Sequence, residues 1–122
     1  MKYPTAKITD KLTIVEIKIA RIKDPVKLDN LQKEFQILNR AVVSIIDKKH
    51  PLYLELYDIN SQLWDIEDRI RDLERVKDFG DEFIQTARSV YFINDKRSEV
   101  KRAINELTGS DLTEEKSYEK YQ

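Results

Sequence analysis

Residues 51–78, PLYLELYDINSQLWDIEDRIRDLERVKD, decide the fold. Their aliphatic side chains recur at alternating spacings of four and three residues, and they are Leu52, Leu56, Ile59, Leu63, Ile66, Ile70 and Leu73. This alternation places the side chains in one stripe along an α-helix. The stretch therefore predicts a long amphipathic helix with one apolar face.

Two neighbouring segments show the same helical periodicity. Residues 25–48 carry an unbroken stripe, which consists of Leu28, Leu31, Phe35, Leu38, Val42 and Ile45. Residues 81–108 carry a similar stripe, but Asn94 and Arg97 interrupt it near its centre. Both segments are predicted to be helices, and the interruption is the most informative irregularity in the chain.

The segment 10–23 is shorter and its pattern is less decisive. Leu12, Val15 and Ile19 are spaced as on a helix, whereas its many β-branched residues would also suit a strand. We expect a helix, because a single strand would have no partner strand. The strand alternative stays open on sequence grounds.

Helix-breaking residues fall between these segments. Asp24-Pro25 and His50-Pro51 are each typical of an N-cap followed by proline at the first helical position. Gly80 is expected to end the third segment ahead of an N-cap at Asp81, and Gly109 to end the fourth. Such short connections favour antiparallel neighbours.

The predicted fold is all-α. It is an antiparallel helical bundle of three long helices plus a shorter N-terminal helix, with coiled-coil-like packing. The 122 residues suffice for a single helical domain, 1–122, with a polar C-terminal tail at 110–122. Because the first helix is too short to cover the other three, we expect exposed apolar surface and self-association.

The composition excludes several classes of protein. Lys and Arg number 22 against 23 Asp and Glu, so no excess positive charge is present to bind nucleic acid non-specifically. No stretch reaches the ~20 apolar residues that cross a membrane, so no membrane association is expected. The absence of Cys is compatible with a reducing compartment, and we expect a cytoplasmic protein.

A second stripe of residues 51–78 runs beside the aliphatic one and consists of Tyr53, Tyr57, Asn60, Trp64, Glu67, Arg71 and Glu74. Its aromatic side chains are unusual for a solvated face, so the stripe is expected to face another part of the protein. In an antiparallel hairpin with residues 81–108, Glu67, Asn94 and Arg97 would form one polar cluster.

Two interpretations of this cluster are open. In the first, Glu67 neutralises Arg97 beneath Trp64, and the network fixes helix register. In the second, a surplus of guanidinium groups clamps a small anion. The candidate residues for a polar cluster or a ligand site are Trp64, Glu67, Arg71, Arg88, Tyr91, Asn94 and Arg97.

No cofactor and no metal site is predicted. Four aspartates share one helix face, namely Asp58, Asp65, Asp68 and Asp72, but that face is interpreted as solvated rather than as a metal platform. The single histidine, His50, is expected to cap a helix. Catalytic residues cannot be assigned from the sequence.

Several short motifs carry a family resemblance. They are DKLTI (10–14), LWDIEDRIR (63–71), DFG (78–80), ARSVY (87–91), ND (94–95) and EEKSY (114–118). With them the chain resembles an uncharacterised family of small bacterial and phage helical proteins, a domain of unknown function. The resemblance implies a cytosolic bacterial or phage setting and no particular activity.

Two functions follow from these observations, and they leave open whether the chain is an enzyme. The first is a non-catalytic helical interaction or oligomerisation module, whose partner is a second copy or another protein. The alternative is a small all-α enzyme or sensor that binds an anionic metabolite, such as a phosphorylated sugar, a nucleotide or a carboxylate, through the arginine-rich cluster.

Overall fold

A computed structural model describes residues 5–109 and confirms the all-α fold. It contains four helices: α1 (Thr5–Arg21), α2 (Pro25–Val43), α3 (Pro51–Arg75) and α4 (Asp81–Leu107). The segment whose pattern was ambiguous is helical, and no strand occurs within the described residues. The expected polar tail at 110–122 lies outside them. None of these helices combines the length and the apolar character that a membrane span requires.

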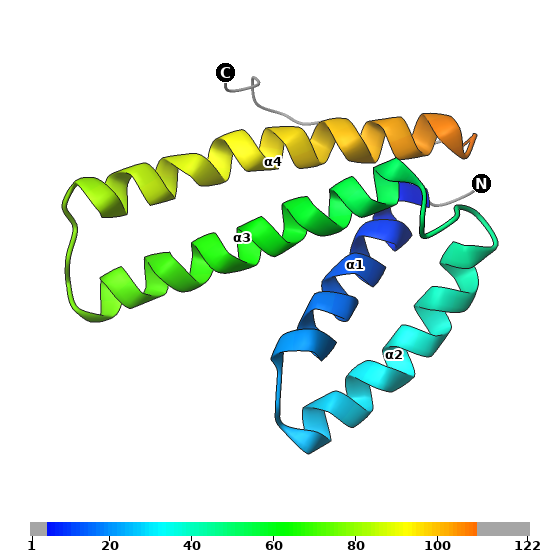
Figure 1. Cartoon of the computed structure of the whole chain (residues 1–122), viewed down its shortest axis with the longest axis horizontal. Helices are drawn as coiled ribbons and strands as arrows, with labels where there is room; N and C mark the ends of the chain where they lie inside the picture. The colour runs from blue at the N-terminus through cyan, green and yellow to red at the C-terminus, as the bar shows by residue number, and fades with distance from the viewer. Residues whose placement is uncertain (1–4, 110–122) are drawn as a thin grey trace.

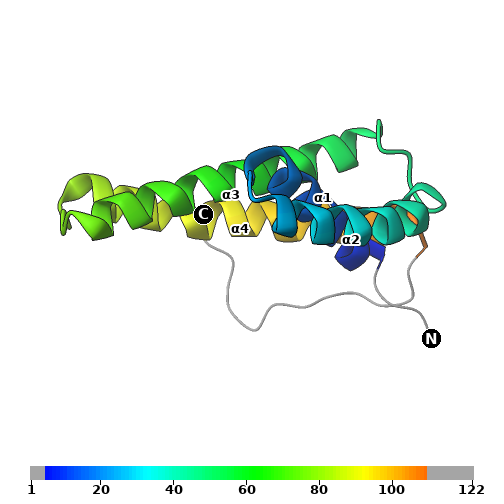
Figure 2. The same cartoon turned by 90° about the horizontal axis from the view of Figure 1, so that it is seen from below.

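The chain folds as two helical hairpins that diverge from one end (Figure 1). α1 pairs with α2, and α3 pairs with α4. α1 also contacts both α3 and α4, whereas α2 lies beside α1 alone among the described helices. The turned view shows α2 and α1 crossing beside the α3–α4 hairpin at only one of its ends (Figure 2). The short first helix is therefore the centre of the packing, and α2 and α3 do not pair across their short connection.

The core lies where α1 meets the other helices. Ala6 and Leu12 of α1 cluster with Val42 of α2, Leu56 of α3 and Ile104 of α4, and all five are fully buried. α1 buries residues over more than half of its circumference, as expected for a helix that contacts three neighbours. Its β-branched residues are accommodated because burial outweighs their small helix penalty.

The first turn of α1 is capped from the far end of the chain. The Asn105 side chain, on the last turn of α4, accepts a hydrogen bond from the backbone N–H of Ala6 at 2.9 Å. It also accepts one from the Thr5 hydroxyl at 3.4 Å. Because the first N–H groups of a helix have no intrahelical partner, Asn105 joins the two helix ends. α1 consequently begins at Thr5, five residues earlier than the segment 10–23 predicted.

The N-caps at Asp24 and His50 are confirmed, while the ends of two helices differ from the prediction. α2 ends at Val43 rather than near residue 48. Ser44, the first residue after the helix, donates its hydroxyl to the carbonyl of Ala41 in the last turn. α3 ends at Arg75, and the left-handed residue after it is Lys77, with φ 57°, not Gly80. Gly80 instead occupies the N-cap position of α4, where no side chain caps the helix.

Lys77→Gly is expected to stabilise the protein by about 0.5–1 kcal/mol. A side chain with a Cβ atom is strained in the left-handed conformation, and glycine is not. Lys33→Gly in the middle of α2 serves as the matched control and should cost about 1 kcal/mol, because glycine weakens a helix interior. Denaturant unfolding of both variants measures the effect, and a loss of stability in Lys77→Gly would contradict the turn geometry.

Candidate functional site

A buried carboxylate joins α1, α3 and α4. Asp10 is only 6% exposed, although it is charged. Its Oδ1 accepts hydrogen bonds from Asn60 Nδ2 of α3 at 2.9 Å and from Arg97 Nε of α4 at 3.0 Å. Its Oδ2 accepts from Arg97 Nη2, so that the guanidinium and the carboxylate pair through two parallel bonds.

Two further groups complete the surroundings of Asp10. Lys101 Nζ lies 4.0 Å from Asp10 Oδ2. Asn60 Nδ2 also donates to the Thr13 hydroxyl at 2.8 Å, and this hydroxyl donates to the Asp10 backbone carbonyl at 2.7 Å. The Asp10 cluster, defined as Asp10, Thr13, Asn60, Arg97 and Lys101, thus gives the buried charge two cations and an amide donor, as such a charge requires.

The partner of Arg97 differs from the one that the sequence suggested. Arg97 pairs with Asp10, and Glu67 is exposed. Trp64 does not cover Arg97 but lies beside Arg21, whose guanidinium carbon is 5.9 Å from the ring centroid. Asp10 could not be recognised from the sequence pattern, because the stripe that predicts the first helix begins only at that position. A helical stripe extended toward the N-terminus passes through Ala6, Asp10 and Thr13 at spacings of four and three, and this spacing places Asp10 on a face of the helix that packs against its neighbours.

A cavity of about 390 Å³ adjoins the Asp10 cluster between α1, α3 and α4. Four of the predicted site residues line it: Trp64, Glu67, Asn94 and Arg97. The remaining lining residues are Ile14, Ile17, Lys18, Asn60, Leu63 and Val90. The cavity therefore combines an apolar wall, one aromatic ring and a small set of charged and amide groups, as small-molecule sites commonly do.

The other three predicted site residues lie away from this cavity. Arg71 is exposed and lies 3.9 Å from Asp68 on the same helix. Arg88 and Tyr91 are exposed on α4. The cavity thus holds one of the three arginines that the sequence suggested as an anion clamp, together with Lys18, which the sequence pattern did not indicate.

A second polar network lies where the two hairpins meet. The Tyr53 hydroxyl donates a hydrogen bond to Glu16 Oε1. Lys48 Nζ lies 2.9 Å from Glu16 Oε2 and 2.8 Å from Asn39 Oδ1. Burial raises the pKa of Tyr53 well above its usual range, and the hydrogen bond to the Glu16 carboxylate raises the pKa further. Tyr53 therefore acts as a neutral donor that links α3 to α1.

The described residues contain no group of three or more His, Cys, Asp and Glu side chains placed to hold a metal ion. The four aspartates on α3 interact with neighbouring polar side chains instead. Asp65 pairs with Arg21, Asp68 lies near Arg71, Asp72 pairs with Arg75, and Asp58 accepts a hydrogen bond from Gln62.

The Asp10–Arg97 pair is expected to contribute to stability as a unit. Asp10→Ala and Arg97→Ala should each cost about 3 kcal/mol, because each leaves the partner charge in a poorly hydrated position. The double variant should lose much less than the sum of the two. Glu67→Ala is the control and should stay within about 0.5 kcal/mol of the wild type. Additive losses in denaturant melts would contradict the pairing.

Tyr53 is expected to remain un-ionised near pH 10 in the folded protein. Because its folded pKa is raised, its contribution to stability is complete below the ordinary tyrosine pKa of ~10 and is lost as the pH rises toward the folded pKa. Ultraviolet titration of tyrosinate in wild type and Tyr53→Phe measures the difference. A one-tyrosine step near pH 10 in the folded protein, absent from Tyr53→Phe, would disagree with this placement.

Comparison with known proteins gives a family and no activity. A family model described as "Family of unknown function (DUF6165)" matches residues 1–121, and the chain belongs to that family. No curated protein and no solved structure gives a significant match.

Proposed function

We propose that this member of a family of unknown function is a non-catalytic helical interaction module that self-associates. The proposed setting is the cytoplasm of a bacterium or of a phage-infected cell, and it rests on the resemblance of the sequence motifs. The observation that carries the self-association is the exposed apolar surface of one part of the α3–α4 hairpin. Residues 66–89, which form the half of that hairpin nearer its turn, are called the arm.

The arm projects beyond the α1–α2 hairpin (Figure 1). Only Leu73 is buried within it. Val76, Phe79 and Ile84 are 72%, 50% and 48% exposed. Among the helices of residues 5–109, no third one covers the two paired helices along the arm, and such exposure of apolar side chains marks an interaction surface.

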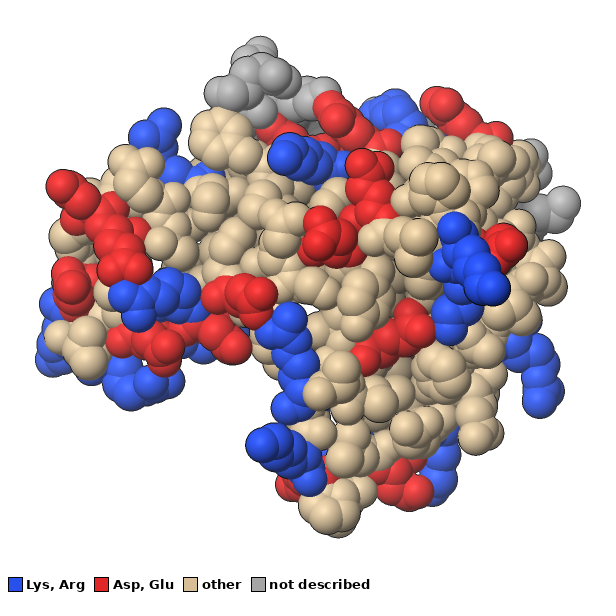
Figure 3. All heavy atoms as spheres, viewed as in Figure 1, with Lys and Arg blue, Asp and Glu red and all other residues tan. Residues whose placement is uncertain are grey.

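A second copy of this chain fits the arm by charge. The arm, residues 66–89, carries seven acidic and five basic residues, a net charge of −2. Residues 5–50, which contain α1 and α2, carry ten basic and six acidic residues, a net charge of +4. Figure 3 shows acidic and basic side chains interspersed over the arm, and basic side chains along the edge of the α1–α2 hairpin that borders a notch in the molecular outline. Opposite charge on two parts of one chain favours their pairing between copies.

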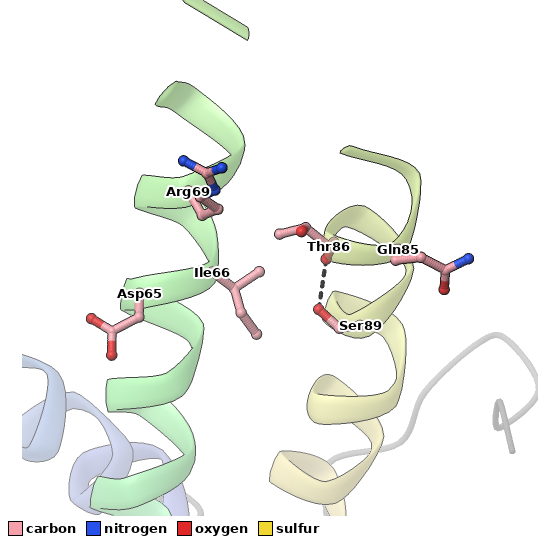
Figure 4. Close-up of a pocket in the computed structure, with 6 residues that line it drawn as sticks. All are labelled: Asp65, Ile66, Arg69, Gln85, Thr86 and Ser89. Atoms are coloured by element: carbon pink, nitrogen blue, oxygen red, sulfur yellow. Dashed lines mark hydrogen bonds between the residues drawn. The ribbon is translucent and has the colours of Figure 1, made fainter. Parts of the chain in front are cut away.

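A shallow groove in the arm offers a place for apolar side chains. It is lined by Ile66 of α3 and by Thr86 and Ser89 of α4, with Arg69 and Asp65 on the α3 side. Figure 4 shows Ile66 and Thr86 pointing toward each other across the gap between the helices, while Ser89 bonds back to the Thr86 carbonyl. The small α4 side chains leave the groove unfilled, so an apolar side chain from another chain has room to enter.

Reciprocal docking would close a dimer. If the arm of one copy packs on the α1–α2 hairpin of the other, a two-fold axis makes the reverse contact identical. The contact would be coiled-coil-like, because it packs helices side by side. A closed dimer also uses both arms and leaves no site for open-ended assembly.

Size-exclusion chromatography with light scattering at micromolar concentration tests the proposal. The wild type is expected at twice the chain mass of 14.5 kDa. Val76→Ser/Ile84→Ser should run as a monomer, because both side chains lie exposed on the arm. Raising the salt concentration should shift the wild type toward monomer, since the charge attraction is screened.

Leu54→Ser is the matched control. Leu54 lies on the same helix, α3, is 55% exposed, and is at the end away from the arm, so this variant should stay dimeric. A wild type that elutes at 14.5 kDa over the whole concentration range would refute self-association. Loss of the dimer in Leu54→Ser, with the arm variant unchanged, would assign the contact to another surface.

A further inference from the structure

The geometry points to a ligand site in the cavity between α1, α3 and α4, and we propose that it binds a small aromatic carboxylate. This site is separate from the arm, and it does not depend on the proposed self-association. The inference rests on the charges, the wall and the size of the cavity.

Two cations from different helices face the cavity. They are Lys18 of α1 and Arg97 of α4, against one carboxylate, Glu67, which is exposed at the rim. Asp10 is not among the lining residues, and it binds Arg97 through the Nε edge of the guanidinium. Arginine has five N–H donors, so the remaining N–H groups of Arg97 are left for a ligand.

The Asp10 cluster also fixes the direction of the guanidinium. Two hydrogen bonds to a carboxylate that is nearly inaccessible to water hold Arg97 in one orientation. A donor held in place before binding loses little side-chain entropy when the ligand arrives. Because Lys101 also lies near Asp10, the Asp10 charge is shared between two cations.

The apolar part of the cavity lining is suited to a flat apolar group. Trp64 provides an aromatic ring, and Ile14, Ile17, Leu63 and Val90 provide aliphatic surface. Aromatic rings stack or meet edge to face with tryptophan, and they gain more than their buried area alone would give. A ring that bears one carboxylate satisfies the wall and the cations together.

The size of the cavity favours a single-ring acid over a nucleotide. Its volume of about 390 Å³ lies near the lower end for small-molecule sites. A nucleotide would also bring two or more negative charges to a cavity that already has the Glu67 carboxylate at its rim and in which Arg97 is paired with Asp10. A monoanion brings a single charge, which Lys18 and the remaining N–H groups of Arg97 can bind.

Trp64 is the only tryptophan in the chain and reports binding directly. Its fluorescence is measured as benzoate is added, with benzamide as a neutral probe of the same shape and acetate as a carboxylate without a ring. Benzoate is expected to give a saturable change. Benzamide should bind at least about tenfold more weakly because it cannot accept a charge-assisted hydrogen bond as a carboxylate. Acetate should also bind more weakly because it has no ring to pack against Trp64.

Two lysine variants on α1 distinguish benzoate binding in the cavity from non-specific attraction of benzoate to positive charge. Lys18→Gln should weaken benzoate binding about tenfold. Lys11→Gln, an exposed lysine near Glu34 and outside the cavity, should leave it unchanged. Val76→Ser/Ile84→Ser should still bind benzoate, so failure of the dimer and failure of this site can be told apart.

Three results would overturn the site. They are no saturable change in Trp64 fluorescence with benzoate, equal binding of benzamide and benzoate, and equal weakening by the two lysine variants. A thermal-shift measurement with benzoate provides a second readout, because binding to the folded state alone must raise the melting temperature.

Discussion

The buried carboxylate of Asp10 constrains the whole arrangement of helices. A charge this far from water must find donors within the protein, and those donors come from Asn60 of α3 and Arg97 of α4. The hydrogen bonds of Asp10 can form at only one position of α1 along the α3–α4 hairpin. Apolar stripes alone would tolerate a shift by one helical turn, because such a shift brings another apolar residue to the same face. The Asp10 cluster removes that freedom.

Asn105 supports the same register from the end of α1. The Asn105 side chain accepts a hydrogen bond from the Ala6 N–H and so caps the first turn of α1. This turn is well enclosed, since Ala6 and Thr9 are both fully buried. Two bonds therefore tie α1 to α4. Asn105 binds α1 at Ala6, and Arg97 binds it one helical turn later, at Asp10. Because α1 also carries the contacts to α2, the position of the second hairpin relative to the first depends on these polar bonds as much as on the apolar core.

Periodicity predicts the helices well and their partners poorly. The alternation of three and four is a local property, so the existence of α2, α3 and α4 follows from sequence alone. It does not say which helix faces which, and α2 carries a full stripe although it lies beside α1 only. The end of α3 was also missed, because local backbone hydrogen bonds from the Lys77 and Asp78 N–H groups to the Glu74 and Leu73 carbonyls close the helix with Lys77 in a conformation that is usual for glycine.

The candidate site was predicted in part for the same reason. Trp64, Glu67, Asn94 and Arg97 line one cavity because the two helices of a tight hairpin must face each other, which the short turn already implies. The partner of Arg97 could not be found in this way, since Asp10 lies 87 residues away in the chain. Long-range pairing of this kind depends on how α1 crosses the hairpin, and local spacing carries no information about that crossing.

The cavity and the arm have a common cause in the length of α1. With 17 residues, α1 spans about 26 Å, whereas α3 and α4 with 25 and 27 residues span about 38 and 41 Å. α1 therefore covers only one end of the hairpin. The cavity is lined by Ile17 and Lys18, in the last turns of α1, and the arm lies farther along α3 and α4. Lengthening α1 would bury both surfaces, so its shortness is what leaves this chain with surfaces to bind other molecules.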